Sequence, residues 1–397
     1  MKIAMVTEYA YPVLGGVSEH VHFLSRELAR LGHEVTVVTS RAPRGSRASA
    51  RAIDREALDL AGYATRRIGT SLPVHANGSI ARVTAGPRLA RELSAAVAGA
   101  DVVHAQGLVT LTLPLLALRE ASSRALVGTF HTFLTHDHWG YSAFERPLRA
   151  LLSRLDRRIA VSAACVETLA AHFPGRYDIV PNGVDCDLFR PLEPGQVPPE
   201  GPPRVLFVGR FDERNALDTL LDAAALLRAD GRPFILQVVG DGPARARHAA
   251  RARRLGIAEL VDWRGALRDG RPRLYREAAV LAAPCTVASF GVILLEAMAS
   301  GAPVVCADNV GFRQVIRDGA PGRFVPPRDP ECLAAAIGEV LDDAPLRARW
   351  AIDGRALAVS RYSWPLVARE IEAVYSEILG GAGGPPVALS AGDPEAG

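Results

Sequence analysis

The chain has 397 residues, of which 49% are hydrophobic and 22% are charged, and its formal net charge at pH 7 is +3. This length favours two domains, because a single hydrophobic core rarely grows beyond about 250 to 300 residues. The composition is typical of a soluble globular protein, and the small net charge excludes a strong general attraction to nucleic acid. No apolar run reaches the roughly 20 residues that a membrane-spanning helix needs.

The cysteines and the first residues bear on the compartment. The cysteine count is odd, and the spacing of the five cysteines matches no metal site. Met1–Met5 opens directly into a strand pattern, without the features of a leader peptide. We therefore expect a reducing, cytoplasmic compartment.

Short apolar runs alternate with amphipathic segments in the first half, which predicts parallel α/β architecture. Val17–Leu31 is expected to be a helix, because its apolar residues recur at intervals of three and four. The expected strands of this half are Lys2–Thr7, Glu34–Thr39, Asp101–Ala105, Ala125–Phe130 and Arg158–Ser162.

The second half repeats the pattern after a Pro- and Gly-rich segment, Pro191–Pro203, that predicts a linker. We therefore expect an α/β fold of two Rossmann-like, doubly wound domains that face each other across a cleft, with ligands beyond the carboxyl ends of the strands. The expected strands of this half are Arg204–Gly209, Phe234–Gly240, Leu260–Trp263, Ala279–Ala283, Pro303–Ala307 and Arg323–Val325.

Two loops near strand ends carry residues suited to a site. Gly15 and Gly16 stand at the entrance of the first helix, where the lack of a Cβ lets the backbone approach a bound group. Asp185 and Asp187 have the spacing of a metal-binding pair, but they overlap the tight turn Pro181–Asp185. Two carboxylates without further ligands make a poor divalent site, so we expect no metal.

Two arginine-rich stretches lie in the first half. A solvated face explains both, but a peripheral contact with the inner face of a membrane is an alternative, since such contacts combine basic charge with buried apolar area. The first stretch holds Arg41, Arg44, Arg47, Arg51 and Arg55, and the second holds Arg146, Arg149, Arg154, Arg157 and Arg158.

The segment that follows Ala279–Pro284 predicts an anion site. Ser289 is expected to be the N-cap of a helix over Phe290–Ala299, which Gly301 ends. A small-residue turn that enters a helix presents free N–H groups and the positive end of the helix dipole, which suits a diphosphate. Glu296 lies two turns into this helix, where a carboxylate can bind a ribose diol.

Ser289–Val305 resembles the donor signature of the retaining, nucleotide-sugar-dependent glycosyltransferases of family 4. The family pattern is Glu, Ser-Phe-Gly, four apolar residues, and Glu-Ala-Met-Ala-x-Gly-x-Pro-Val; this chain departs from it at Ala288, where the leading glutamate is expected. The resemblance spans residues 1 to 380 and implies the GT-B fold. It implies a first domain over 1–190, a linker over 191–203, a donor-binding domain over 204–363, a last helix over 364–380 that crosses back to the first domain, and a disordered tail over 381–397.

A second stretch resembles the family segment Gly-Arg-x-x-x-x-Lys-Gly, in which the two cations neutralise the diphosphate. Arg210 matches the arginine, whereas Asn215 stands at the lysine position and Ala216 at the glycine. An arginine binds phosphate in a bidentate manner, while an asparagine offers only neutral donors. Arg214, one position earlier, either replaces the missing cation or is a solvated helix-start residue.

The resemblance also implies roles for other residues. His131, in Gly128–Thr132 at a strand end, matches the family histidine that contacts the donor sugar. The Gly15–Gly16 loop is implied to lie near the diphosphate, together with the helix start formed by Phe290, Gly291 and Val292.

The implied activity is transfer of a hexose from a nucleotide diphosphate sugar to a hydroxyl of a lipid, glycan or small molecule, with retention and without a metal or cofactor. Arg210 and His131 are the implied catalytic residues, and Glu296 is implied to hold the ribose. Ala288 and Asn215 leave open a second hypothesis, that of a catalytically impaired protein which binds a nucleotide sugar. A sugar-nucleotide epimerase is a weaker third, because no pattern supplies acid–base carboxylates in the cleft.

Overall fold

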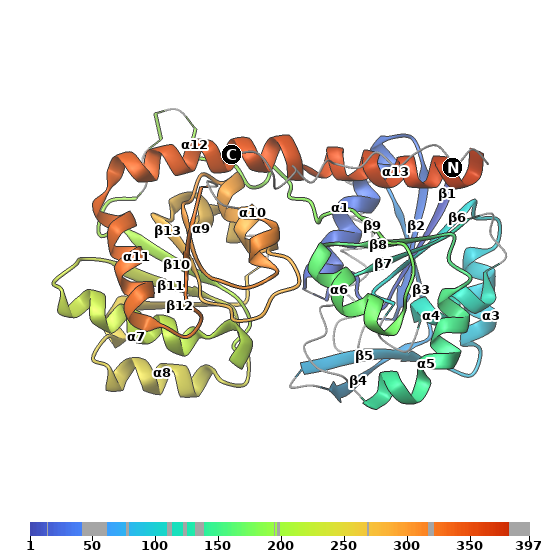
Figure 1. Ribbon diagram of the computed structural model, residues 1–397, viewed down its shortest axis with the longest axis horizontal. Coiled ribbons are helices and arrows are strands. Elements are labelled where there is room, and N and C mark those ends of the chain that lie inside the picture. The colour runs from blue at the N-terminus through green and yellow to red at the C-terminus, as the bar shows by residue number, and fades with distance from the viewer. Residues whose placement is uncertain are drawn as a thin grey trace.

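The computed structural model describes residues 1–380 except 14, 42–61, 77–78, 109–112, 122–124, 132–138, 194, 197–198, 268–269 and 317–320. Two parallel sheets, each flanked by helices, lie side by side along the long axis of the molecule (Figure 1). The predicted α/β architecture is therefore confirmed.

The first sheet has the strand order β3-β2-β1-β6-β7-β8-β9, and all of its pairs are parallel. Its central strands are buried apolar runs, as expected for a sheet covered on both faces. The strands are β1 (Lys2–Thr7), β2 (Glu34–Ser40), β3 (Ala64–Ile68), β6 (Val102–Gln106), β7 (Ala125–Phe130), β8 (Arg157–Ala160) and β9 (Asp178–Ile179). Around them lie α1 (Gly16–Arg30), α3 (Leu89–Val97), α4 (Leu113–Glu120), α5 (Trp139–Leu152), α6 (Ala163–His172) and an antiparallel hairpin of β4 (Thr70–Ala76) and β5 (Ser79–Ala85).

The second sheet has the order β12-β11-β10-β13-β14-β15, again with parallel pairs only. Its strands are β10 (Arg204–Val208), β11 (Ile235–Val239), β12 (Val261–Gly265), β13 (Val280–Ala283), β14 (Val304–Ala307) and β15 (Arg323–Val325). The helices are α7 (Leu217–Ala229), α8 (Arg245–Arg254), α9 (Arg271–Glu277), α10 (Val292–Ala299) and α11 (Pro330–Asp342), with short 3₁₀ turns η2 (Glu213–Asn215), η3 (Ala258–Leu260) and η4 (Phe312–Gln314).

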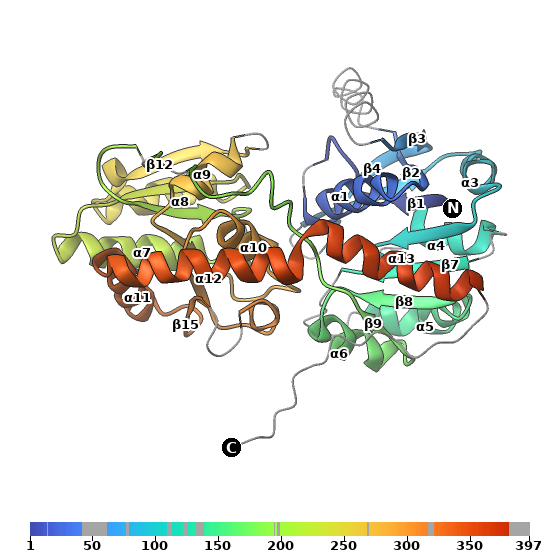
Figure 2. The ribbon, with the colours of Figure 1, turned by 90° about the horizontal axis from the view of Figure 1, so that it is seen from above.

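Two consecutive helices, α12 (Ala344–Tyr362) and α13 (Trp364–Gly380), run across both halves (Figures 1 and 2). The predicted return of the last helix is confirmed, because α13 packs against α1 and β7 and buries Ile371 and Tyr375 in the core of the first sheet. The junction lies on the Pro181–Asp185 turn, where a Cβ on Gly183 would stand 2.6 Å from Trp364. Glycine is required there by this close approach.

The predicted strands agree with the structure to within one or two residues, but β3, β4, β5 and β9 were not predicted, and two serines differ from their expected roles. The prediction that Ser289 caps a helix beginning at Phe290 is wrong: α10 begins at Val292 and its N-cap is Gly291. The Phe290 side chain is buried against Tyr362, and this packing holds the preceding turn out of the helix. Ser162, predicted to end a strand, instead caps α6 by accepting a hydrogen bond from the Cys165 N–H.

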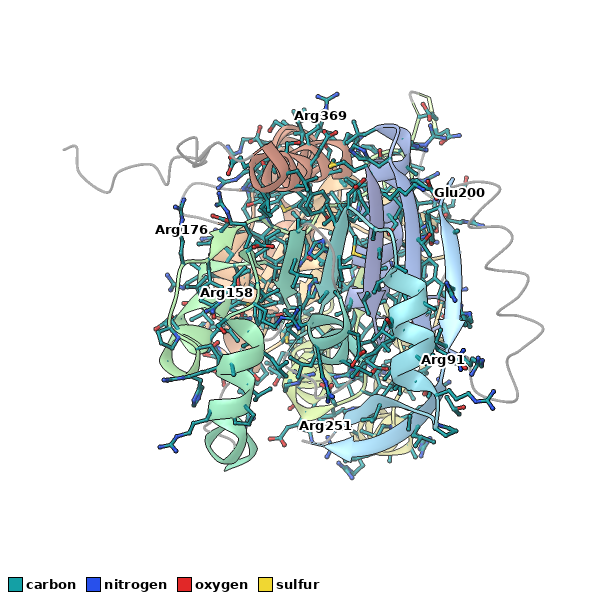
Figure 3. The ribbon with its side chains drawn as sticks, turned by 90° about the vertical axis from the view of Figure 1, so that its right-hand side faces the viewer. Arg91, Arg158, Arg176, Glu200, Arg251 and Arg369 are labelled. Carbon is teal, nitrogen blue, oxygen red and sulfur yellow. The ribbon has the colours of Figure 1, made fainter. Side chains whose placement is uncertain are left out.

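Surface arginines of the first half are used locally where the structure describes them. Arg154 and Arg158 donate to backbone carbonyl oxygens of neighbouring segments, and Arg157 pairs with Asp178 and Glu377. In Figure 3, Arg158 and Arg176 lie on one side of the first half and Arg91 lies on the other. Arg44, Arg47, Arg51 and Arg55 lie outside the described residues. Among the helices that the structure describes, none has the length and apolar character to cross a bilayer.

Candidate functional site

The predicted site residues follow the carboxyl ends of four parallel strands, two from each sheet. The loop after β1 leads to Gly16, the end of β7 to His131, the loop after β10 to Arg210, and the loop after β13 to α10. In doubly wound sheets this edge is where ligands bind. Residues of α1 and α10 line a shared cavity of about 10 Å³, so Gly16 and Glu296 border the same space.

Arg210 and Arg214 meet at one carboxylate. Both donate to Oδ2 of Asp212, at 2.9 Å and 3.4 Å, and both side chains are more than half exposed, at 57% and 56%. The backbone carbonyl of Arg214 also accepts a hydrogen bond of 2.8 Å from the N–H of Thr286, which ties this loop to the loop before α10. Two guanidinium groups therefore lie together, next to the segment that leads into α10.

Asn215 holds the shape of the same loop. Its Nδ2 donates to the carbonyl of Arg210 at 2.9 Å and to Oδ1 of Asp212 at 2.8 Å. Both amide hydrogens are thus used inside the loop. Ala216 follows with a left-handed backbone, φ 48° and ψ 40°, at the position where the family pattern has glycine.

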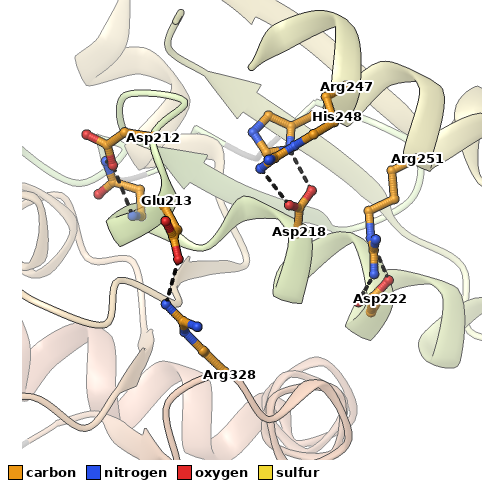
Figure 4. Close-up of polar contacts among 9 residues, drawn as sticks. Asp212, Glu213, Asp218, Asp222, Arg247, His248, Arg251 and Arg328 are labelled. Carbon is orange, nitrogen blue, oxygen red and sulfur yellow. Dashed lines mark hydrogen bonds and ion pairs between the residues drawn. The ribbon is translucent and has the colours of Figure 1, made fainter. Parts of the chain in front are cut away.

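The flank beyond this loop is an array of ion pairs (Figure 4). Asp218 at the start of α7 accepts from Arg247 and His248 of α8, and Asp222 accepts from Arg251. The acidic side of α7 is thereby matched by basic side chains of α8.

The start of α10 carries N–H groups without intrahelical partners, as any helix start does. Gly291 at the N-cap adds no side chain there, although Phe312 and Leu294 lie close to where a Cβ would stand. Ala288, at the position of the family glutamate, is partly buried and packs against the hydrophobic cluster that connects the two sheets. The backbone carbonyl of Ser289 accepts a 2.7 Å hydrogen bond from Ser162 of the first half.

Glu296 is buried and takes part in a bridge between the two halves. One nitrogen of Arg271, Nη2, donates to Oε1 of Glu296 at 2.8 Å and to Oε1 of Glu19 in α1 at 3.0 Å. The exposed fractions of the three side chains are 3% for Glu296, 12% for Glu19 and 17% for Arg271. The Tyr275 side chain lies beside this carboxylate and interacts with it, while Oε2 of Glu296 makes no hydrogen bond of good geometry with the described residues.

The electrostatics of the bridge follow from its burial. Burial raises the pKa of Glu296 to about 7, although Arg271 opposes the rise. Burial disfavours the charge of Arg271, but the carboxylates of Glu296 and Glu19 outweigh it and raise the pKa of that guanidinium. An unpartnered buried carboxylate oxygen costs free energy, and hydroxyl donors of a ligand would remove that cost.

His131 lies in a group of buried, neutral imidazoles. Its Nε2 is 2.7 Å from Oε1 of Gln106, and its ring stands edge-on to His20 with centroids 4.6 Å apart. Burial lowers the pKa of His131 well below its usual value, and it lowers the pKa of His20 to about 4. The Asn182 side chain, from the Pro181–Asp185 turn, hydrogen-bonds His20 at 2.8 Å.

The glycines at the start of α1 border open space. A Cβ on Gly15 or Gly16 would meet no atom of the described chain within 4 Å. Packing therefore does not require Gly16, which is what a role in ligand approach predicts, whereas the φ of 156° at Gly15 is a backbone conformation that itself favours glycine. Asp185, by contrast, pairs with Arg26 at 2.7 Å and accepts the N–H groups of Asp187 and Leu188, so that carboxylate has a structural use.

Sequence analysis did not identify Arg271, Glu19, Gln106 or Ser162. Each acts through a partner far along the chain; Arg271 and Glu19, for example, are separated by 252 positions. Only Arg271 could have been found from local sequence, because it follows Gly270 at the start of the helix after β12. A helix start after a strand lies at the ligand-binding edge of such a sheet.

Two facing Rossmann-like sheets, with cations and a helix start at the cleft, define a glycosyltransferase of the GT-B type. Family models agree: residues 14–188 match "Glycosyltransferase Family 4" and residues 190–357 match "Glycosyl transferases group 1". The chain belongs to the family 4 glycosyltransferases.

Relatives extend over nearly the whole chain. The phosphatidyl-myo-inositol mannosyltransferase of Mycobacterium tuberculosis H37Rv is 33% identical over 389 residues, covering 96% of this chain and 98% of that one. The glycogen synthase of the same organism is 30% identical, covering 94% of each. Among solved structures, Anabaena HepE in complex with UDP and glucose has a TM-score of 0.75 at 20% identity, covering 95% of this chain and 99% of that one.

Proposed function

We propose that the protein transfers a hexose from a nucleotide diphosphate sugar to a hydroxyl acceptor, with retention of configuration at the anomeric carbon. The observation that carries the proposal is the buried carboxylate of Glu296, a residue that lines the shared cavity and whose Oε2 makes no hydrogen bond of good geometry with the described residues. A ribose diol supplies the donors that this oxygen needs. Arg210 and Arg214 lie in a loop that the N–H of Thr286 ties to the segment before α10, on which a diphosphate attached to that ribose can be bound.

Stabilisation of the leaving group accounts for the catalysis. The bond between the anomeric carbon and the diphosphate oxygen breaks, and the electron pair leaves with the diphosphate. Arg210, Arg214 and the N–H groups at the start of α10 neutralise the charge that develops there. The acceptor oxygen bonds to the anomeric carbon on the same face, and its proton passes to a phosphate oxygen of the leaving group. His131 binds a hydroxyl of the transferred sugar. No step calls for a metal.

The second hypothesis, a nucleotide-sugar-binding protein with impaired catalysis, rests on Ala288 and Asn215. Ala288 packs against the apolar cluster, and Asn215 brings no charge. The pairing of Arg214 with Arg210 on Asp212 favours the enzyme, because the loop retains two cations despite the loss of the lysine.

The acceptor to test first is an inositol lipid, since relatives with that acceptor in their name cover almost all of the chain. A lipid acceptor would also give the arginine-rich loop around Arg41–Arg55 a role at an inner membrane face. Glycan and small-molecule hydroxyls are the competing acceptors.

The test is a panel of radiolabelled hexose donors carrying UDP, GDP or ADP, each incubated with phosphatidylinositol vesicles, an oligosaccharide and free inositol. Transfer of label to an acceptor, with the anomeric configuration read by NMR, is the expected result. Calorimetric binding of a nucleoside diphosphate without transfer from any donor would favour the impaired protein. The absence of both binding and transfer would refute the proposal.

A further inference from the structure

A chain of hydrogen bonds runs through the core of the first sheet and ends at His131. It begins at the Tyr375 hydroxyl on α13, 2.6 Å from Nδ1 of His104. Nε2 of His104 lies 2.7 Å from Oγ1 of Thr129 and 3.2 Å from Nε2 of Gln106. Oε1 of Gln106 then lies 2.7 Å from Nε2 of His131. Every member except His131 is fully buried.

The direction of this chain follows from the neighbours of Gln106. The amide nitrogen of Gln106 faces the sulfur of Met5 at 3.2 Å, and a thioether can only accept. The amide oxygen therefore faces His131, whose Nε2 must carry the hydrogen. The Gln106 amide N–H faces Nε2 of His104, which therefore accepts, so the Nδ1–H of His104 donates to Tyr375.

We propose that Gln106 is a positioning residue that fixes His131 in the tautomer with Nε2 protonated, so that Nδ1 accepts a hydrogen bond from a hydroxyl of the donor sugar. This inference rests on the proposed function for the contact with the sugar, but the tautomer itself does not. In the opposite tautomer Nε2 would be an acceptor facing the acceptor Oε1 of Gln106, and Nδ1–H could only donate to the oxygen of the sugar hydroxyl.

The surroundings keep the imidazole neutral, which the acceptor role requires. His20 from α1 and His104 from β6 are the titratable groups that face His131, and no carboxylate of the described residues is among the groups that shift its pKa. Burial and these two imidazoles lower that pKa well below its usual value. His131 thus offers a lone pair across the neutral pH range.

The ring is also held from a second side. His20 stands edge-on to His131 and is itself hydrogen-bonded to Asn182, while its other face meets Trp364 at 5.1 Å between centroids. Because α13 supplies both Trp364 and Tyr375, the helix that returns from the second half sets both the position of the ring and the start of the hydrogen-bond chain. Outer partners that orient a working histidine in this way are commonly worth about 10- to 100-fold in activity or affinity.

The direct test is the ¹⁵N NMR spectrum of the protein labelled in its histidine rings, without any ligand. The expected result is a pyrrole-type Nε2 and a pyridine-type Nδ1 for His131, with both signals lost in His131→Gln as the assignment control. Gln106→Leu is expected to release the ring into a mixture of tautomers. A His131 protonated at Nδ1 in the native protein would overturn the inference.

The kinetic test uses UDP-glucose and GDP-mannose as donors, with Gln237→Leu as the matched control. Gln237 is also a buried glutamine on a central strand, but in the second sheet. Gln106→Leu is expected to lower kcat by about 10- to 100-fold while Kd for UDP or GDP stays constant, and Gln237→Leu is expected to change neither.

Gln106→Glu is expected to change the pH dependence of kcat, which would stay the same if Gln106 only stabilised the fold. A carboxylate at this position would raise the pKa of His131, so that Nδ1 becomes protonated as the pH falls. The kcat of this variant is expected to fall on the acid side of neutrality, where the native enzyme shows no such limb. If donors are turned over and both Gln106 variants keep the native kcat and pH profile, the inference is overturned and the proposed function stands. If no donor is turned over, the NMR result still decides the tautomer.

Discussion

Arg271 of the second half donates to Glu19 of the first at 3.0 Å, through the same nitrogen that holds Glu296. The carboxylate of Glu296, which we propose to bind the ribose, is thus part of the contact that joins the two halves of the molecule. A ligand that reaches Glu296 must share or displace this bridge, because the adjoining cavity measures only about 10 Å³. Binding of the donor and separation of the halves are therefore linked.

Replacing Glu19 tests whether donor binding is linked to separation of the two halves. Glu19→Gln keeps the Arg271–Glu296 pair but weakens the half of the bridge that crosses the cleft. We expect a larger radius of gyration of the free protein in small-angle X-ray scattering and faster association of UDP or GDP in stopped-flow measurements. The matched control is Glu277→Gln, whose partner Arg273 lies one turn earlier on α9. Identical scattering and association rates for Glu19→Gln and the native protein would contradict the linkage.

Glu296 predicts a pH-dependent affinity. Burial raises the pKa of this carboxyl to about 7, against the effect of Arg271, and the ionised form is the better acceptor for ribose hydroxyls. Affinity for UDP or GDP should therefore increase as the pH rises from 6 to 8, through roughly the pKa of this group. Glu296→Gln should remove this dependence and weaken binding by about 1.5–3 kcal/mol at pH 8. Calorimetry across the pH range measures both; native affinity in the folded Gln variant would refute the ribose contact.

A substitution at Gly16 distinguishes an effect on ligand binding from an effect on folding. A Cβ there would enter open space, and alanine favours the first turn of a helix at least as well as glycine. Gly16→Ala should keep the native melting temperature or raise it, and yet weaken nucleotide diphosphate binding at least about tenfold, which is 1.4 kcal/mol. Gly380→Ala, also beside open space, is the control at the far end of α13. Full affinity in Gly16→Ala would show that the glycine has no ligand role.

Ala216 carries a backbone conformation that glycine adopts more easily. A left-handed non-glycine residue costs roughly 1–2 kcal/mol, and the greater freedom of glycine in the unfolded chain offsets about 0.4–1 kcal/mol of that. Ala216→Gly should therefore raise the free energy of unfolding by up to about 1 kcal/mol in urea titrations. Ala223→Gly in the interior of α7 has an ordinary helical conformation and should have the opposite sign. A destabilised Ala216→Gly variant would mean that the Ala216 methyl packs more favourably than its conformation costs.

The sequence predicted what local pattern and strand order determine. Buried runs located the strands of the two sheets, and the loops that carry Gly16, Arg210 and the start of α10 follow carboxyl ends of those strands because parallel strands direct their ends to one side. What it missed depends on three-dimensional neighbours. The residues next to Arg271 in the sequence do not indicate its contact with Glu19. The hydrogen bonds that Gln106 makes with His104 and His131 are likewise visible only in the folded structure. The wrong N-cap at Ser289 has the same origin, since burial of Phe290 outweighed the local preference of serine for a cap.

Replacing Arg214 tests whether this residue supplies the positive charge that the family pattern has in a lysine at position 215. If Arg214 binds the diphosphate, Arg214→Ala should weaken UDP or GDP binding by about 1.5–3 kcal/mol, as Arg210→Ala should, because each removes a charged hydrogen-bond donor. Binding of uridine or guanosine, which lack phosphate, should not change. Arg251→Ala, on the paired flank of α8, serves as the control.

Asn215→Lys tests the same idea from the other side, because it places a cation at the position next to Arg214. In that background Arg214→Ala should cost little, since the lysine meets the same phosphate charge; the two changes are then strongly non-additive. The lysine also breaks the two hydrogen bonds that Asn215 makes within the loop, so Asn215→Lys alone should lower stability slightly. Combining it with Ala288→Glu should raise kcat at least about tenfold if the family geometry persists, as expected for restored electrostatic contacts to the donor. Brisk native turnover that the double change lowers would show instead that Ala288 and Asn215 are adapted to a different donor.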